Sequence, residues 1–300
     1  MKPLYGAIEA GGTKFVCAVA SADGAWLREA RIATTTPQQT LREVLDFFSA
    51  MHTELGPVAA FGVGAFGPLE LDRRSPHWGR LLKTPKPGWS GADLLAPLRE
   101  RFGVALAIDT DVNAAALAEA QLGAGQGLRS VAYVTVGTGI GGGFVIDGQS
   151  LSGVMHPEIG HLPVRRHPRD LAFTGCCPFH RDCLEGMAAG PAIIARWQLP
   201  LRELGPDSEA ADIIASYLGQ LATSIALTIS SERIVFGGGV METPGLVELV
   251  QQSARQWLNG YLPRTPLDGD LGSYIVAPGL GTRSGLTGAL LLAQRADTTR

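Results

Sequence analysis

The alternation of apolar and polar positions predicts short strands, tight glycine turns and amphipathic helices. The stretch LYGAIEAGGTKFVCAVA (4–20) predicts two apolar strands joined by a glycine turn, and a second strand pair is expected around residues 26–33. Thr36 is a plausible N-cap with Pro37 at the first helical position, which predicts a helix there. The apolar face of this helix consists of Leu41, Val44, Leu45, Phe48 and Leu55.

The same patterns continue along the chain. VAAFGVGAFGPLEL (58–71) predicts a strand that ends in a glycine-rich loop, and residues 72–91 are expected to be irregular. A helix at LLAPLRERFG, a strand at VALAIDTDV and a helix at NAAALAEAQLG follow. SVAYVTVGTGIGGGFVIDG (130–148) then repeats the early theme of strand, glycine turn and strand.

The last part of the chain is expected to be mainly helical. Residues 150–186 are expected to form a loop, with helices near 186–197 and 208–230. SERIVFGGGVM predicts a strand into a third glycine turn, and a helix should follow at about 244–260. SYIVAPGLG is the last predicted strand and SGLTGALLLAQRA the last helix. Two α/β halves of related design would produce this repeated order, in one two-lobed α/β molecule.

Composition limits the class of protein. With 300 residues, 45% of them hydrophobic and 18% charged, the chain can bury a sizeable core. A net charge of -3 gives no general attraction to nucleic acid or to an anionic membrane. The sequence has no run of roughly 18 apolar residues, so no membrane span is expected. The N-terminus MKPLYGAIEAGGTK lacks the apolar core of a signal peptide, so a cytoplasmic location is expected.

Three of the four cysteines lie in TGCCPFHRDCLEG (174–186). Cytoplasmic thiols stay reduced, which favours metal binding over disulfides. Cys177, His180 and Cys183 have the spacing of a zinc knuckle, and His161 in the preceding loop can supply a fourth ligand. Four protein ligands leave no open position, so the expected ion is a structural zinc. Buried thiols beside an exposed histidine are the alternative.

The glycine turns are candidate phosphate sites, because backbone N–H groups can converge on an anion where no Cβ obstructs them. The first turn also carries a hydroxyl, an ammonium group and a carboxylate that could hold Mg²⁺ directly or through water. The alternative is that each turn is a tight hairpin that needs positive φ. Three such turns in order favour phosphate binding, although neither GxxxxGK[ST] nor a helix-opening GxGxxG is present. The turns comprise Glu9–Lys14, Gly137–Gly143 and Gly237–Gly239.

The segments GAIEAGGTK, AIDTDVNAAALAE, YVTVGTGIGGG, HPEIGH, the cysteine segment and IVFGGGV occur in this order. This arrangement resembles the ROK family (repressors, open reading frames and sugar kinases), and within it the bacterial fructokinase branch. The resemblance implies the two-lobed actin/hexokinase-type (ribonuclease H-like) ATPase fold with duplicated α/β lobes and a zinc-binding loop at 156–186. One lobe is expected at 1–113, with a C-terminal helix 283–300 packing back on it, and the other at 114–282.

The resemblance also implies roles for individual residues. Asp111 matches the catalytic base, which accepts the proton of the sugar hydroxyl; the alternative is that it only caps the helix after it. Thr110 stands where the family has Asn, and His180 where most relatives have Cys. The expected sugar-binding residues are Gly67, Pro68, Thr110, Asp111, Glu158, His161 and Glu185. The expected nucleotide-binding residues are Glu9, Gly11, Gly12, Thr13, Lys14, Gly137, Thr138, Gly139, Pro191, Gly237, Gly238 and Gly239.

The implied activity is Mg-ATP-dependent phosphorylation of the 6-hydroxyl of a hexose, and D-fructose is the first candidate for that hexose. Glucose, mannose and N-acylated hexosamines remain alternatives within the family. A sugar-responsive repressor is the rival from another class; such repressors carry an N-terminal helix-turn-helix, whereas this chain starts on its phosphate-loop strand. A catalytically dead sugar sensor is disfavoured by Asp111, Thr13 and the three turns. A homodimer is the usual assembly among similar proteins.

Overall fold

The computed structural model describes residues 2–298, and their contacts divide the chain into two units. Unit 1 holds the residues up to 118, residues 152–156 and those from 283 on; unit 2 holds residues 119–151 and 157–282. The first turns of α3 (Asp111–Leu122) therefore belong to unit 1, beyond the expected boundary at residue 113. A Cβ on Gly288 would lie 1.9 Å from the carbonyl oxygen of Ala114, so α3 packs closely against the last helix. Residues 299 and 300 of the expected last helix lie outside the described residues.

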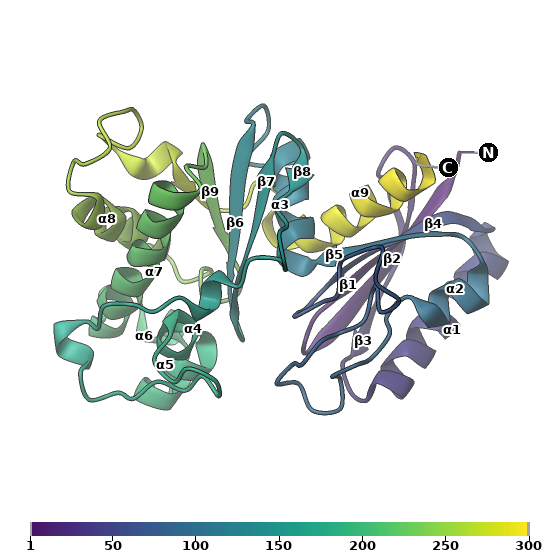
Figure 1. Cartoon of the computed structure of the whole chain (residues 1–300), viewed down its shortest axis with the longest axis horizontal. Coiled ribbons are helices and arrows are strands. Elements are labelled where there is room, and N and C mark those ends of the chain that lie inside the picture. The colour runs from purple at the N-terminus through teal and green to yellow at the C-terminus, as the bar shows by residue number, and fades with distance from the viewer. Residues whose placement is uncertain (1, 299–300) are drawn as a thin grey trace. The chain divides into compact units, whose positions relative to one another are not determined.

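The sheet of unit 1 has the strand order β3-β2-β1-β4-β5 over the described residues (Figure 1). The first three strands run antiparallel to one another, as the glycine turn predicts, while β1, β4 and β5 are parallel. Parallel neighbours need crossover connections, which the helices between them supply. The strands are β1 (Leu4–Ala10), β2 (Lys14–Ser21), β3 (Trp26–Ala33), β4 (Val58–Ala65) and β5 (Ala105–Thr110).

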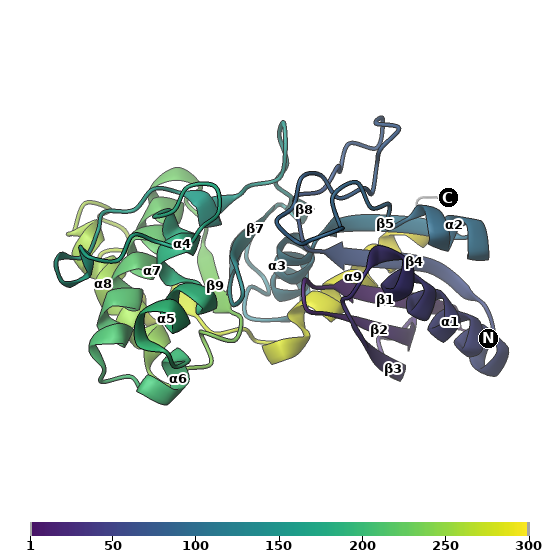
Figure 2. The same cartoon turned by 90° about the horizontal axis from the view of Figure 1, so that it is seen from below.

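Helices cover both faces of this sheet (Figure 2). One face packs against α1 (Pro37–Leu55) and α2 (Ala96–Phe102), and the other against α9 (Ser284–Thr298). The predicted N-cap is present, since the Thr36 side chain accepts a hydrogen bond from the Gln39 N–H. On the α9 face Gly62 permits a close approach, because a Cβ there would lie 1.9 Å from the Ala289 carbonyl oxygen.

Unit 2 has a second sheet of the order β10-β9-β6-β7-β8 over the described residues. Its central strand β6 runs antiparallel to β7 across the second glycine turn and parallel to β9. The last strand is shorter than its apolar pattern predicts, and the short strand β8 was not predicted. The strands are β6 (Ser130–Val136), β7 (Ile140–Ile146), β8 (Gln149–Ser150), β9 (Arg233–Gly237) and β10 (Ile275–Val276).

The core of unit 2 is built around the helix α7 (Glu209–Thr228). This helix is long and apolar enough to cross a membrane by length and composition, but 72% of its most apolar window is buried inside the protein. Its hydrophobicity is thus explained by packing against the sheet and against α8 (Leu246–Leu258). The remaining helices are α4 (Leu184–Ala188), α5 (Gly190–Trp197) and α6 (Leu201–Leu204), and 3₁₀ turns occupy Ile159–His161, Pro168–Asp170, Leu271–Ser273 and Gly281–Arg283.

Candidate functional site

Three of the predicted segments leave the sheet of unit 1 at the same edge. The parallel strands β1, β4 and β5 are in register at their ends, where Ala10 pairs with Ala65 and Ala65 pairs with Thr110. The first glycine turn follows Ala10, the loop with Gly67 and Pro68 follows Ala65, and Asp111 follows Thr110. The sheet therefore brings candidate phosphate-binding, sugar-binding and base residues to one edge, as expected for ligand sites at the carboxyl ends of parallel strands.

Asp111 does not serve as the cap of α3. The cap is Thr110, whose side-chain oxygen accepts a hydrogen bond from the Asn113 N–H at 3.1 Å. The Asp111 carboxylate accepts a hydrogen bond from its neighbour, the Val112 N–H, at 2.9 Å. Burial raises the pKa of Asp111 to about 6. A carboxylate with a pKa near the working pH has the proton affinity that a general base needs.

Glu9 is electrostatically coupled to Asp111. Burial, and after it the charge of Asp111, raise the pKa of Glu9 to about 7, while Lys14 acts in the opposite direction. Gly285 packs directly against the Glu9 carboxylate, where a Cβ would lie 2.5 Å from Oε1. Buried carboxylates with raised pKa values can be held ionised by a bound divalent cation. The donor set therefore fits a magnesium ion near Glu9.

The first glycine turn presents its polar groups to solvent. Gly12, Thr13 and Lys14 are exposed, and a Cβ on Gly12 would meet no atom within 4 Å. The turn is held by the Gly11 N–H, which donates to the Lys14 carbonyl at 3.0 Å. Neither glycine adopts positive φ. A need for left-handed backbone therefore does not explain them. At Gly11 a Cβ would lie 2.9 Å from the Lys14 carbonyl oxygen, so the tightness of the turn explains that glycine, and access for a ligand is left as the reason for Gly12 alone.

The second and third glycine turns adjoin one another in unit 2. They follow the paired strands β6 and β9, and the Val240 N–H donates to the Val136 carbonyl at 3.0 Å. Gly238 is required by its geometry: it has a φ of 91°, and a Cβ would lie 2.5 Å from the Val136 oxygen. The Gly190 N–H also donates to the Gly137 carbonyl at 2.7 Å, which sets the start of α5 and Pro191 beside the second turn.

Glu185 lies on α4 and contacts the second glycine turn. Its Oε2 accepts a hydrogen bond from the Ile140 N–H at 2.9 Å. The carboxylate occupies the space beside Gly139, where a Cβ would lie 2.6 Å from Oε2. One of the predicted sugar-binding residues thus also supports a predicted phosphate turn, which the sequence alone did not indicate.

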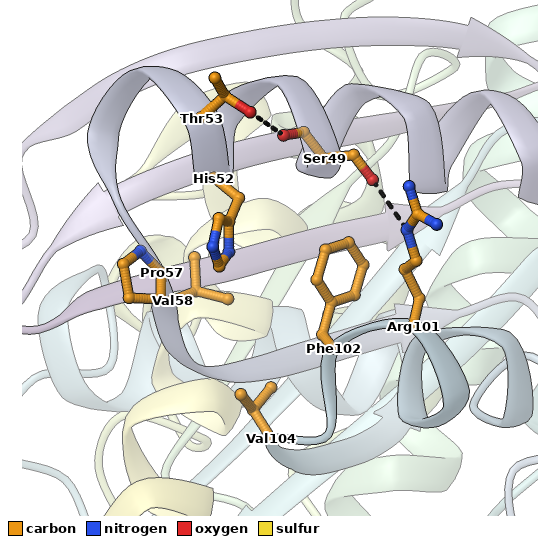
Figure 3. A pocket seen from close by; sticks show the side chains of 8 residues that line it. All are labelled: Ser49, His52, Thr53, Pro57, Val58, Arg101, Phe102 and Val104. Carbon is orange, nitrogen blue, oxygen red and sulfur yellow. Dashed lines mark hydrogen bonds between the residues drawn. The ribbon is translucent and has the colours of Figure 1, made fainter.

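Two pockets among the described residues were not predicted from the sequence. One, of about 350 Å³, is lined by Ser49, His52, Thr53, Pro57, Val58, Arg101, Phe102 and Val104 and contains none of the predicted site residues (Figure 3). The other, of about 380 Å³, begins at Met241, just after the third glycine turn. Glu242, Val247 and Glu248 are among the residues that line it.

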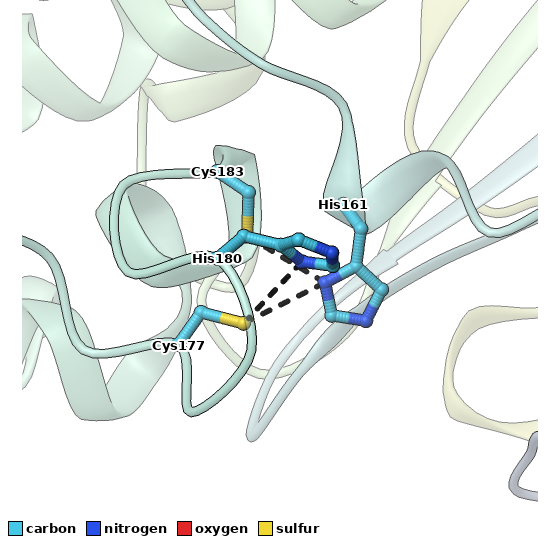
Figure 4. Close-up of side chains that lie close together, drawn as sticks. All are labelled: His161, Cys177, His180 and Cys183. Carbon is cyan, nitrogen blue, oxygen red and sulfur yellow. Dashed lines mark hydrogen bonds between the residues drawn. The ribbon is translucent and has the colours of Figure 1, made fainter.

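The four predicted metal ligands come together in unit 2. One potential ligand atom from each of His161, Cys177, His180 and Cys183 lies within 4.8 Å of the others (Figure 4). The Nδ1 of His161 is 3.7 Å from the sulfur of Cys177 and 3.5 Å from that of Cys183. The Nδ1 of His180 is 3.9 Å from the sulfur of Cys177. Cys176 is exposed and outside the cluster.

These separations fit a tetrahedral ion. Zn–S bonds of about 2.3 Å and Zn–N bonds of about 2.0–2.1 Å place sulfur and nitrogen ligands about 3.6 Å apart. Burial raises the pKa of the Cys183 thiol to about 11, so the thiolate needs a cation for its stabilisation. The second ring nitrogen of His161 points away from the other three side chains (Figure 4).

The other predicted sugar-binding residues are placed as follows. Glu158 is exposed and precedes the 3₁₀ turn that carries His161, and its carbonyl accepts from the His161 N–H at 3.0 Å. Gly67 and Pro68 lie in unit 1 and are joined by a cis peptide bond. His156 is not among the predicted site residues, and its buried ring accepts a hydrogen bond from the Leu69 N–H at 3.0 Å. No spacing pattern indicates that contact.

Comparisons with known proteins extend over nearly the whole chain. The model of the ROK family matches residues 5–296. The chain is 46% identical to a fructokinase of Zymomonas mobilis, covering 99% of this chain and 98% of that protein. It is 40% identical to a fructokinase of Pediococcus pentosaceus, covering 98% of each.

A solved structure and a more distant relative also match the chain over nearly its whole length. A ROK hexokinase from Thermus thermophilus superimposes with a TM-score of 0.79 at 29% identity, and the match covers 100% of both chains. A glucokinase of Streptomyces coelicolor is 26% identical over 97% of both chains. The fold expected from the sequence, a two-lobed α/β sugar kinase fold, is therefore confirmed.

Proposed function

The chain belongs to the ROK family, and from that premise we propose that it transfers the γ-phosphoryl group of Mg-ATP to the 6-hydroxyl of a hexose, with D-fructose preferred. The observation that carries the kinase assignment is Asp111, a carboxylate with a pKa near 6 at the edge that also bears the first phosphate turn. Phosphoryl transfer needs a group that accepts the hydroxyl proton, with positioning and charge neutralisation supplying the rest.

We assign the nucleotide to the three glycine turns. Backbone N–H groups at these turns and the Lys14 ammonium would hold the phosphates, and Glu9 would hold magnesium directly or through water. The pocket of about 380 Å³ beside the third turn supports a place for the nucleoside. It falls in the usual size range of ligand sites, and its carboxylates can accept hydrogen bonds from ribose hydroxyls.

We assign a structural zinc to His161, Cys177, His180 and Cys183, on the fit of their separations to tetrahedral geometry. A zinc bound there would cross-link the segment 156–186 and would take no part in the chemistry. Ligation through Nδ1 leaves the other nitrogen of His161 as a hydrogen-bond donor. Glu158, His161 and Glu185 would then contribute acceptors and a donor to the sugar hydroxyls.

The two units would have different tasks. Unit 1 would supply the base, the magnesium ligand, the first phosphate turn and the wall at Gly67 and Pro68. Unit 2 would supply two phosphate turns, the metal cluster and the sugar-binding carboxylates. We further propose a homodimer in the cytoplasm, where the cysteines, none of which forms a disulfide in the structure, stay reduced.

Fructose is favoured over glucose by the relatives, which are 39–46% identical when named fructokinase but 26% when named glucokinase. A coupled assay of ADP release over fructose, glucose, mannose and N-acetylmannosamine tests this choice. We expect the highest kcat/KM with fructose. A higher value with another hexose would correct the substrate, and no sugar-dependent ADP release would contradict the kinase assignment.

A further inference from the structure

The chain between two of the metal ligands makes a long excursion with little regular structure. Residues 162–176 separate His161 from Cys177, and their only regular element is the 3₁₀ turn Pro168–Asp170. A metal cluster holds the two ends of such an excursion and leaves its middle unrestrained. Ordering each residue costs roughly 1–2 kcal/mol in backbone entropy, so the middle needs contacts of its own.

Asp170, near the midpoint, supplies a buried anchor. Its carboxylate pairs with the Arg196 guanidinium of α5, and the two side chains are only 5% and 7% exposed. The Tyr217 hydroxyl of α7 donates to the same carboxylate oxygen at 2.7 Å. That hydroxyl also accepts from the His167 N–H at 3.3 Å. Two helices that are distant in sequence, α5 and α7, therefore donate to one buried carboxylate oxygen of the turn.

The Arg196 side chain extends this anchor to the sugar-binding helix. It donates a hydrogen bond to the carbonyl of Met187, which lies in α4 together with Glu185. Its guanidinium also lies over the rings of Phe173 and Trp197, with centroid distances of 4.4 and 4.3 Å. One cation thus contacts the excursion at Asp170 and Phe173, and α4 at Met187.

We propose that Asp170, Arg196 and Tyr217 form a second anchor that positions the sugar-binding residues independently of the metal cluster. These are positioning residues, because none is assigned a contact with the substrate. A buried charge is tolerated only with its partner, so the pair forms or is lost as a unit. The proposal rests on the proposed function only in that the positioned groups, Glu185 above all, bind the sugar.

The test uses a double variant that leaves no unpaired buried charge, Asp170→Asn with Arg196→Met. We expect the zinc content per chain to equal that of the wild type, because no metal ligand is changed. The KM for fructose should rise about tenfold or more, since small misplacements of binding groups have large effects. The KM for ATP should change little, and kcat at saturating sugar should fall less than kcat/KM.

The matched control is Arg169→Gln in the same turn. Arg169 is 48% exposed and pairs with Asp212 at 3.1 Å and Glu209 at 3.4 Å on the surface. Exposed ion pairs contribute little, so both KM values should match the wild type. An equal effect of this control and of the double variant would overturn the proposal, because any loosening of the turn would then suffice.

Tyr217→Phe is the milder variant: it keeps the ring and the Asp170–Arg196 pair but removes both hydrogen bonds of the hydroxyl. It should raise the KM for fructose less than the double variant does. An unchanged fructose KM in the folded variants, or loss of zinc along with the rise in KM, would overturn the independent anchor. Limited proteolysis of the metal-loaded proteins separates this proposal from the activity. Faster cleavage within residues 162–176 in the double variant supports the anchor even if fructose is not the substrate, and wild-type cleavage rates contradict it.

Discussion

The sheet edge at Asp111 and the loop at residues 156–186 hold their functional groups in different ways. At the edge, strand register aligns the ends of β1, β4 and β5, so backbone hydrogen bonds set the positions of Glu9 and Asp111. In the loop, side chains provide the links: the metal cluster at its ends and the Asp170–Arg196 pair near its middle. A site whose backbone is fixed by strand pairing should keep its structure when only the reacting side chain is changed. A loop that is cross-linked by side chains should lose its order when one of those side chains is removed.

The largest effect is expected at the sheet edge. Asp111→Asn removes the group that accepts the hydroxyl proton, so kcat should fall by roughly 10²- to 10⁴-fold. Folding and ATP binding should persist, because the strands hold the edge. Stopped assays of phosphoryl transfer and calorimetric ATP titration measure the two properties.

Asp109→Asn is the matched control for this variant. Asp109 lies two residues earlier on β5, where its Oδ1 accepts from the Thr110 N–H at 2.8 Å and from Asn113 at 2.7 Å. An amide oxygen can still accept both bonds, so most of the activity should remain. If Asp109→Asn is inactive and Asp111→Asn is active, the two carboxylates have been assigned the wrong way round.

The loop should respond to loss of its cross-links. Chelation of the metal, or Cys183→Ser, should raise the KM for sugar about tenfold or more, because a structural zinc contributes on the order of 10 kcal/mol to ordering its ligands. The KM for ATP should change much less. Cys176→Ser is the control and should have no effect, since Cys176 lies outside the cluster. Damage by Cys176→Ser but not by Cys183→Ser would show that the wrong cysteine was assigned to the metal.

The pH dependence offers a smaller test of the sheet edge. Burial raises the pKa of Asp111 to about 6, so its fraction of active carboxylate falls as the pH drops through that value. Below it, kcat/KM should decrease about tenfold per pH unit, because this profile reports the free enzyme. A rate that stays constant down to pH 5 would contradict the role of Asp111 as base.

The smallest effect concerns stability. Thr110→Ala removes the cap of α3 and should lower the free energy of unfolding by about 1 kcal/mol. Thr110→Ser keeps the hydroxyl and should cost less. Urea denaturation of the two variants measures the difference. Equal stability of Ala and Ser at this position would show that the bond from the Asn113 N–H contributes nothing.

The sequence predicted the parts of this molecule whose signals are local. Apolar periodicity placed the two strand–turn–strand units, and the Thr36-Pro37 pair marked the start of α1. The proximity of the four Cys and His side chains was also predictable, because Cys177, His180 and Cys183 lie within seven residues at a knuckle-like spacing. A cap of α3 at Asp111 was only the alternative to its role as base, and Thr110 caps the helix instead.

Local sequence patterns could not predict contacts between residues that are far apart in the sequence. Asp170 pairs with Arg196, 26 positions later, and with Tyr217, 47 positions later. No periodicity in the sequence connects these residues. The contact of Glu185 with the turn at Ile140 also spans 45 positions. The strand β10 was predicted too long, because the apolar run around it continues beyond the two residues that pair with β9.

We propose that this chain phosphorylates the 6-hydroxyl of a hexose with ATP, and that fructose is the preferred hexose. The most direct measurement is ³¹P NMR of the products formed by the purified protein from fructose and Mg-ATP. We expect a phosphomonoester on carbon 6 of fructose and one ADP for each sugar phosphate. ADP with inorganic phosphate and no sugar phosphate, or a phosphoryl group on another carbon, would contradict it.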